Sequence, residues 1–147
     1  MATIGFVFGT SDGNYADIGD FLVPRDLFSE GGLWTVGGNS FGQLGDNTSA
    51  IKSSPVQTIA GGTNWKQVAG GYGLTVAIKT DGTLWIWGNQ GAGGALGDGT
   101  LVIKSSPVQT VASGSNWKSV SSGSIHVSAI KTDGTLWTWG YNGDGEL

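Results

Sequence analysis

Apolar and aromatic residues along this chain occur in short runs, each bounded by Gly, Asp or Asn. Residues 83–87 (Thr-Leu-Trp-Ile-Trp) are β-branched and aromatic, a composition typical of a strand. Because Gly accepts the positive φ of a tight turn, Asp81-Gly82 predicts a hairpin that pairs residues 74–79 with 83–87. Two further strands are predicted at 55–59 and 65–68.

The same pattern returns along the chain. Residues 51–58 recur unchanged as 103–110, at an offset of 52, and residues 77–85 recur as 129–137. Four strands in about 52 residues match one blade of a β-propeller. We therefore expect an all-β fold of blades with four antiparallel strands each. The predicted division is a leader at 1–32 and repeats at 33–147, namely 33–83, 84–135 and a partial copy, 136–147.

The third copy stops at Leu147, the equivalent of Leu44 and Leu96. A unit that is half made would leave an apolar face bare. The sequence therefore predicts either a fragment of a longer array or several chains that complete one another's sheets.

Composition excludes several classes of protein. The 28 Gly have no period of three and there are 3 Pro, which excludes collagen, while 7 Trp and 38% hydrophobic residues argue against disorder. The chain has no Cys for a disulfide or thiolate metal site, and no apolar run approaches the ~18 residues of a membrane span. The net charge of −4 has the wrong sign for nonspecific nucleic-acid binding. We expect no nucleic-acid partner, no membrane insertion and no signal peptide.

Candidate catalytic and metal-binding residues are few. The single His, His126, stands where the previous copy has Leu74, and no nucleophile–base set can be assembled around it. Asp46 and Asp98 repeat, but each loop offers one carboxylate, so turn capping is favoured over calcium binding. The Gly-rich segment 88–99 lacks phosphate-loop spacing and is expected to be a blade loop. We expect no enzyme and no catalytic, cofactor or metal site.

The Trp residues repeat at blade spacing, which favours a core between blades, with an exposed sugar-binding platform as the alternative. The candidates for surface binding are Lys66, Lys118, Trp65 and Trp117.

The leader, residues 1–32, is aromatic and too short for its own core. It predicts a strand at 3–8 and one helical turn at 24–30. The leader either closes the propeller or docks onto a partner assembly, and docking is favoured. The candidate docking residues are Phe21, Pro24, Arg25, Leu27 and Phe28.

The unit at 33–46, repeated at 136–147, reads Leu-Trp-x-(Val/Trp)-Gly-x-Asn followed by x-x-Gly-x-Leu. With the later Ser-Ser-Pro-Val and Ala-Ile-Lys-Thr-Asp-Gly, it resembles the regulator of chromosome condensation repeat family. The resemblance implies two full blades and the start of a third, as a fragment of a seven-bladed ring. The near-identical copies look like phage and bacterial members, and residues 17–28 resemble the leader of phage-encoded repeat proteins.

The family includes a chromatin exchange factor, a plant ultraviolet sensor and a β-lactamase inhibitor, so membership alone implies no single function. The sensor's Gly-Trp-Arg-His-Thr motif does not occur here. We expect a non-enzymatic structural, adhesion or protein-binding module, such as a tail fibre, appendage or decoration protein of a phage virion. It would have protein partners in a larger assembly or form a homo-oligomer, in the virion or otherwise soluble in the cytoplasm. The alternatives are a soluble regulatory propeller and a carbohydrate-binding module.

Overall fold

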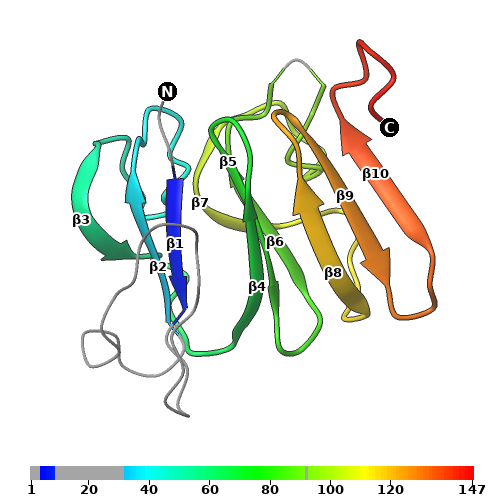
Figure 1. Cartoon of the computed structure of the whole chain (residues 1–147), viewed down its shortest axis with the longest axis horizontal. Coiled ribbons are helices and arrows are strands. Elements are labelled where there is room, and N and C mark those ends of the chain that lie inside the picture. The colour runs from blue at the N-terminus through cyan, green and yellow to red at the C-terminus, as the bar shows by residue number, and fades with distance from the viewer. Residues whose placement is uncertain (1–3, 9–31, 92) are drawn as a thin grey trace.

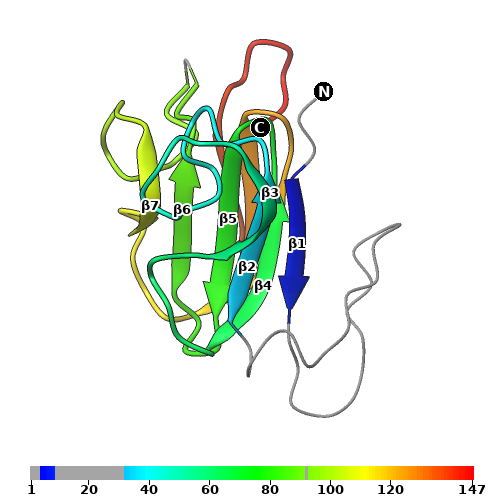
Figure 2. The same cartoon turned by 90° about the vertical axis from the view of Figure 1, so that its left-hand side faces the viewer.

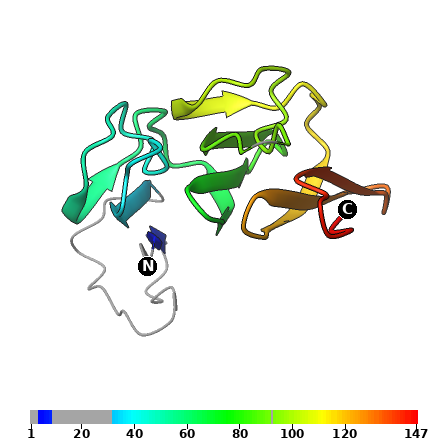
Figure 3. The same cartoon turned by 90° about the horizontal axis from the view of Figure 1, so that it is seen from above.

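The computed structural model describes residues 4–8, 32–91 and 93–147, which form strands, turns and loops (Figure 1). The described strands are β1 (Ile4–Phe8), β2 (Leu33–Gly37), β3 (Lys52–Gln57), β4 (Trp65–Gly70), β5 (Leu74–Lys79), β6 (Leu84–Gly88), β7 (Lys104–Gln109), β8 (Trp117–Ser122), β9 (His126–Lys131) and β10 (Leu136–Gly140). They form three sheets, of order β1-β2-β3, β4-β5-β6-β7 and β8-β9-β10. Seen from above, the sheets stand side by side along a curve, like adjacent blades of a propeller (Figure 3).

The second sheet is a complete blade of four antiparallel strands, which confirms the predicted fold class. Figure 2 shows its strands in order from β7 to β4. The predicted hairpin pairs Leu74 with Gly88 and Ile78 with Leu84. Gly82 closes it with a φ of 80°, and a Cβ there would meet the carbonyl oxygen of Ser115. This turn therefore needs Gly for both its backbone angle and its space.

The first sheet contains the strand predicted in the leader. β1 pairs with β2 so that Ile4 lies opposite Gly37 and Phe8 opposite Leu33, the same register that joins β5 to β6 and β9 to β10. β1 thus occupies the place that β5 has in the second sheet. The predicted boundary before Leu33 falls between two strands that are paired with each other.

Sheets and sequence repeats are out of phase. The repeat at 33–83 supplies β2 and β3 to the first sheet and β4 and β5 to the second. Each repeat therefore ends one sheet and begins the next.

The core lies between the sheets. Leu33, Trp65, Ala77 and Trp87 form a buried cluster, and a second cluster includes Leu74, Ile78, Ile86, Trp117 and Val127. Strand β8 lies against both β4 and β5. The indoles of Trp65, Trp87 and Trp117 therefore contribute to packing between sheets, as the repeat pattern indicated.

Candidate binding surface

One end of the arc carries a repeated cluster of Trp and Lys. This lower end consists of the turns at 80–83 and 132–135 and the segments 58–64 and 110–116, at the bottom of Figure 1. Lys79 Nζ lies 4.7 Å above the ring centroid of Trp65 and 4.5 Å above that of Trp85. The two rings meet edge to face at 6.5 Å. The cation thus bridges two indoles, a favourable electrostatic arrangement.

The next copy repeats this cluster in detail. Lys131 Nζ lies 4.7 Å and 4.3 Å from the centroids of Trp117 and Trp137, whose rings are 6.1 Å apart. Identical residues in a matching arrangement indicate that the cluster stabilises both the second and the third sheet.

The candidate residues of the lower end differ sharply in exposure. Trp65 and Trp117 are only 5% and 2% exposed, so their rings are packed in the core. Lys66 and Lys118 follow them at β-bulges and are exposed. Among the repeated indoles, Trp137 has an accessible side chain, at 44%. A flat sugar platform requires an exposed ring, so Trp65 and Trp117 act here as packing residues.

The hairpin turns of the lower end are closed by Asp. Thr83 donates from its amide at 2.9 Å and from its hydroxyl to the Asp81 carboxylate, and Thr135 does the same to Asp133. These hydrogen bonds from Thr83 and Thr135 lower the pKa of the two carboxyls.

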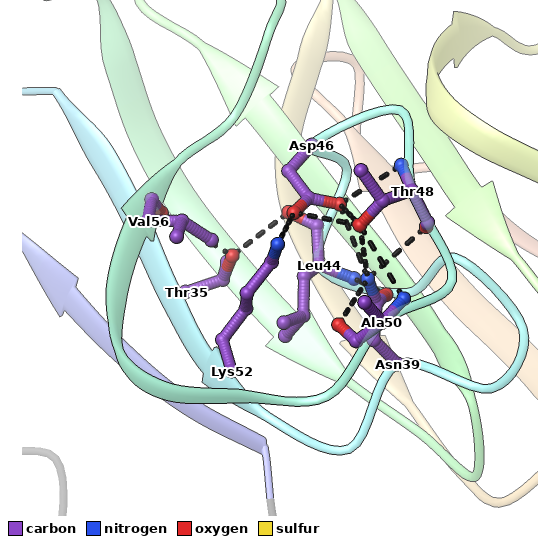
Figure 4. A network of polar contacts seen from close by, with 8 residues as sticks. All are labelled: Thr35, Asn39, Leu44, Asp46, Thr48, Ala50, Lys52 and Val56. Carbon is purple, nitrogen blue, oxygen red and sulfur yellow. Dashed lines mark hydrogen bonds and ion pairs between the residues drawn. The ribbon is translucent and has the colours of Figure 1, made fainter.

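At the other end of the blade, a buried amide organises the loop after β2 (Figure 4). Asn39 is fully buried, and its Nδ2 lies 3.0–3.2 Å from acceptors of Asp46, Thr48 and Ala50. Its Oδ1 accepts the amide of Leu44 at 3.0 Å. One side chain therefore holds both arms of the loop together.

The Asp46 carboxylate is fixed in the same network. It accepts the amide and hydroxyl of Thr48 and forms an ion pair of 3.2 Å with Lys52. Burial raises the pKa of Asp46, but hydrogen bonds from Thr48, Lys52 and Asn39 outweigh it and leave the pKa below its usual value. This carboxylate caps a turn, as the sequence indicated. The described residues contain no cluster of three or more His, Cys, Asp or Glu suited to a metal ion.

The second copy builds the same network with a longer side chain. Gln90 donates to Asp98 at 2.8 Å and to the Thr100 carbonyl at 2.7 Å, and it accepts the amide of Leu96. Its loop has one residue more than the loop after Asn39. Sequence reasoning did not single out the change from Asn39 to Gln90, each two residues after the Gly that ends its strand, which accompanies the longer loop.

The upper end of the arc, at the top of Figure 1, is formed by hairpins 71–73 and 123–125 and by the loop residues 38–50, 89–91, 93–103 and 141–147. The exposed ring of Tyr72 lies 6.2 Å from Phe41. The Tyr141 amide donates to the Ile125 carbonyl at 3.0 Å, so loop 141–147 adjoins the second hairpin. The upper end therefore carries aromatic side chains on a backbone that is held by hydrogen bonds between the hairpins and loops.

An apolar pocket of about 150 Å³ lies beside β10. It is lined by Gly97, Thr110, Val111, Ala112, Trp137, Thr138 and Trp139. In the first two sheets β3 and β7 pair with β2 and β6, whereas no described strand pairs with the corresponding edge of β10.

The predicted docking residues and the predicted helical turn lie outside the described residues. These are Phe21, Pro24, Arg25, Leu27 and Phe28, with the turn at 24–30. In the part of the chain that is described, we find no helix with the length and apolar character of a membrane span.

Antiparallel four-stranded sheets that repeat around an arc define a β-propeller. The chain belongs to the regulator of chromosome condensation (RCC1) repeat family: one model of this repeat matches residues 30–78 and 81–130, and another matches residues 117–146. The predicted family is thereby confirmed, whereas kinship with phage members stays a prediction.

Two sequence relatives cover this chain to different extents. The ultraviolet-B receptor UVR8 of Arabidopsis thaliana is 31% identical over 171 aligned positions, which cover 97% of this chain and 39% of the receptor. The X-linked retinitis pigmentosa GTPase regulator homolog of Caenorhabditis elegans is 34% identical over 84 positions, 56% of this chain and 6% of the relative. The chain thus spans well under half the length of these relatives.

Solved structures agree with the fold. Human WBSCR16 superimposes with a TM-score of 0.66 at 26% identity, over 76% of this chain and 29% of that protein. Yeast RCC1 (Prp20), solved bound to Kap60, gives a TM-score of 0.67 at 20% identity, over 83% and 30%. The likeness to yeast RCC1 shows the propeller fold alone.

Proposed function

We propose that this chain is a protein-binding propeller module without enzymatic activity. The observation that carries the proposal is a contrast between polar side chains that are bound within the blades and an aromatic side chain that is exposed to solvent. Asp46, Asp81 and Lys79 are engaged within the blades, whereas Tyr72 at the upper end is 64% exposed. An exposed aromatic side chain on a fixed backbone is a typical anchor for a protein partner.

The relatives support a binding role. Yeast RCC1 has been solved with Kap60, and a second structure of Prp20p from Saccharomyces cerevisiae is described with binding properties to Gsp1p and histones. These partners belong to the yeast protein, and for this chain they support only the general class of function.

The test is quantitative binding to a partner from the source organism. Chemical cross-linking of the purified chain in an extract would identify a candidate, which is then purified and titrated against the chain. We expect saturable binding of one protein. A folded chain that shows no saturable protein binding would overturn the proposal, and turnover of a small molecule would refute the absence of enzymatic activity.

We propose, as the narrower form of this function, a structural or adhesion component of a phage virion that docks through the leader. The resemblance of residues 17–28 to phage leaders supports it. The structure suggests a test that spares the blades: residues 9–32, between the paired Phe8 and Leu33, are replaced with Lys-Thr-Asp-Gly-Thr, the sequence between the paired Ile78 and Leu84.

Because β1–β2 and β5–β6 share one register, the shortened hairpin should keep β1 in the first sheet. We expect this variant to fold but to be lost from virions that are purified by density-gradient sedimentation. Equal incorporation of the variant and the unmodified chain would refute docking through the leader and leave protein binding by the blades intact.

A further inference from the structure

The two complete copies of the repeat are not equally similar along their length. All nine residues of 77–85 recur at 129–137, and all eight of 51–58 recur at 103–110. Of the ten residues 67–76, only Val68 and Gly71 recur at the corresponding places in 119–128. Divergence is therefore concentrated in 67–76 and in a second segment, 35–50 against 86–102, which contains the loops after β2 and β6.

The segment 67–76 builds one end of the molecule. It comprises most of β4, the hairpin 71–73 and the first half of β5, and its counterpart in the third sheet is the hairpin 123–125 with its flanking strands. Both hairpins lie at the upper end (Figure 1). The lower end is formed mostly by residues that recur: the turn 80–83 is unchanged at 132–135, and between 58–64 and 110–116 the changes are Ile59 to Val, Gly61 to Ser and Thr63 to Ser.

A change of neighbouring sheet does not account for this pattern. Ile78 and Leu84 are buried between sheets, whereas their counterparts Ile130 and Leu136 are 38% and 66% exposed. These residues are nevertheless identical between the copies. The exposure of the side chain changes at these two positions without a change of residue, whereas the residue types of the strand change toward the upper end.

The hydrogen bonds that close the two upper-end hairpins are the same while the side chains differ; the backbone angle changes at Gly73, whose φ is 75°, since its counterpart Ile125 has no positive φ. Gly71 and Gly123 donate to the carbonyls of Leu74 and His126, each at 2.9 Å. The Tyr72 amide also donates to the Ser124 carbonyl at 2.7 Å, which joins the two hairpins. Because hydrogen bonds already order these hairpins, less conformational entropy is lost on binding, as in antibody loops rich in Tyr, Ser and Gly.

The charge of the upper end favours a cationic partner. Lys52 and Lys104 are already paired with Asp46 and Asp98, at 3.2 Å and 3.4 Å. The same end carries Asp144 and Glu146 in loop 141–147, which adjoins Ile125 through the Tyr141 amide. The remaining carboxylates and the aromatic faces both attract cations. The described lysines outside ion pairs are at the lower end, namely Lys66, Lys79, Lys118 and Lys131.

We propose that the upper end, with Tyr72, Ile125, Asp144 and Glu146, is the recognition surface, and that it binds a protein segment bearing Arg or Lys beside an apolar anchor. This inference rests on the proposed protein-binding function and assigns it to one end of the propeller.

In the experiment, peptides that bind the full, immobilised chain are selected from a random linear peptide library. The most enriched peptide is then synthesised and its binding to the chain is titrated. We expect winners enriched in Arg or Lys with aliphatic or aromatic residues. Tyr72→Ser, which introduces the residue of the other copy, should weaken binding about tenfold, the typical loss for an exposed aromatic anchor. Asp144→Asn with Glu146→Gln should weaken binding further and reduce its salt dependence.

Lys66→Gln at the lower end is the matched control and should leave binding unchanged. Circular dichroism and thermal melting of each variant would verify its fold. Winners that are acidic, or that lose binding with Lys66→Gln and not with Tyr72→Ser, would overturn this surface while protein binding stands. If neither a peptide nor a protein binds the folded chain, the proposed function fails as well.

Discussion

The buried amide of Asn39 offers a direct test of how the loops are held. Asn39→Ala removes the acceptor of the Leu44 amide and the donors to the loop 46–50, without a change in backbone length. The side chain is fully buried, so water cannot readily replace it.

The expected cost follows from the hydrogen bonds. An amide nitrogen carries two hydrogens, so two of its acceptors are satisfied at a time, and the Leu44 amide adds a third bond. Each bond contributes roughly 0.5–1.5 kcal/mol, and a buried donor left unpaired costs roughly 1–3 kcal/mol. We expect Asn39→Ala to reduce the free energy of unfolding by about 2–4 kcal/mol, a large share of the ~5–15 kcal/mol typical of a domain.

Urea denaturation followed by Trp fluorescence measures this loss. Asn142→Ala is the matched control, because Asn142 accepts the Leu147 amide in the equivalent but exposed loop. We expect the control to cost less than about 1 kcal/mol. Equal costs at the two positions, or no loss with Asn39→Ala, would refute the assignment of loop stability to the buried amide.

The coupling between side-chain length and loop length gives a sharper check. Gln90→Asn and deletion of Ala92 should each destabilise the protein, because each alone mismatches the side chain with its loop. The double variant restores the lengths of the Asn39 loop, so we expect a favourable coupling of more than about 1 kcal/mol in a double-mutant cycle. Additive losses would contradict the proposed compensation.

Three further predictions concern the blades. Gln67 forms two hydrogen bonds with the backbone of Val120 in the next sheet, at 2.8 Å and 3.2 Å, so Gln67→Ala should cost about 1–2 kcal/mol in urea denaturation while Ser119→Ala costs little. The pKa of Asp81 is lowered in the folded state, so the ionised carboxylate stabilises the fold above its unfolded pKa. This stabilisation is lost as the pH falls through the folded pKa. Asp81→Asn should therefore reduce the fall of the melting temperature at acid pH. Lys79→Met removes the cation between two indoles and should lower stability in a salt-insensitive manner with a shift in Trp emission, and unchanged emission would count against the cation–π contact.

Local sequence signals predicted the blade well. Asp81-Gly82 and the β-branched and aromatic residues that follow it identified the β5–β6 hairpin, because turn geometry and strand composition are both encoded within a few residues. The repeat then placed the equivalent hairpin around Gly134. Packing of the indoles between sheets followed from their spacing.

Long-range pairing was harder to predict. The strand at Ile4–Phe8 shares almost no residues with Leu74–Lys79, so only its register with β2 identifies it as the equivalent strand. The role of Asn39 was also hidden, since its partners lie on the far arm of the loop and a side-chain amide has no distinctive sequence pattern. The upper-end surface could not be predicted from the sequence, because only the structure shows that the diverged residues of the copies lie at one end of the molecule.

The offset between sequence repeats and sheets bears on how such a chain can grow. A unit of 52 residues always contains the material of one whole sheet, whichever residue it starts from, because it completes the sheet behind it and opens the sheet ahead. A tandem duplication of the gene therefore needs no particular breakpoint. Any duplicated stretch of that length inserts one more blade and leaves the two outermost edges of the array chemically as they were.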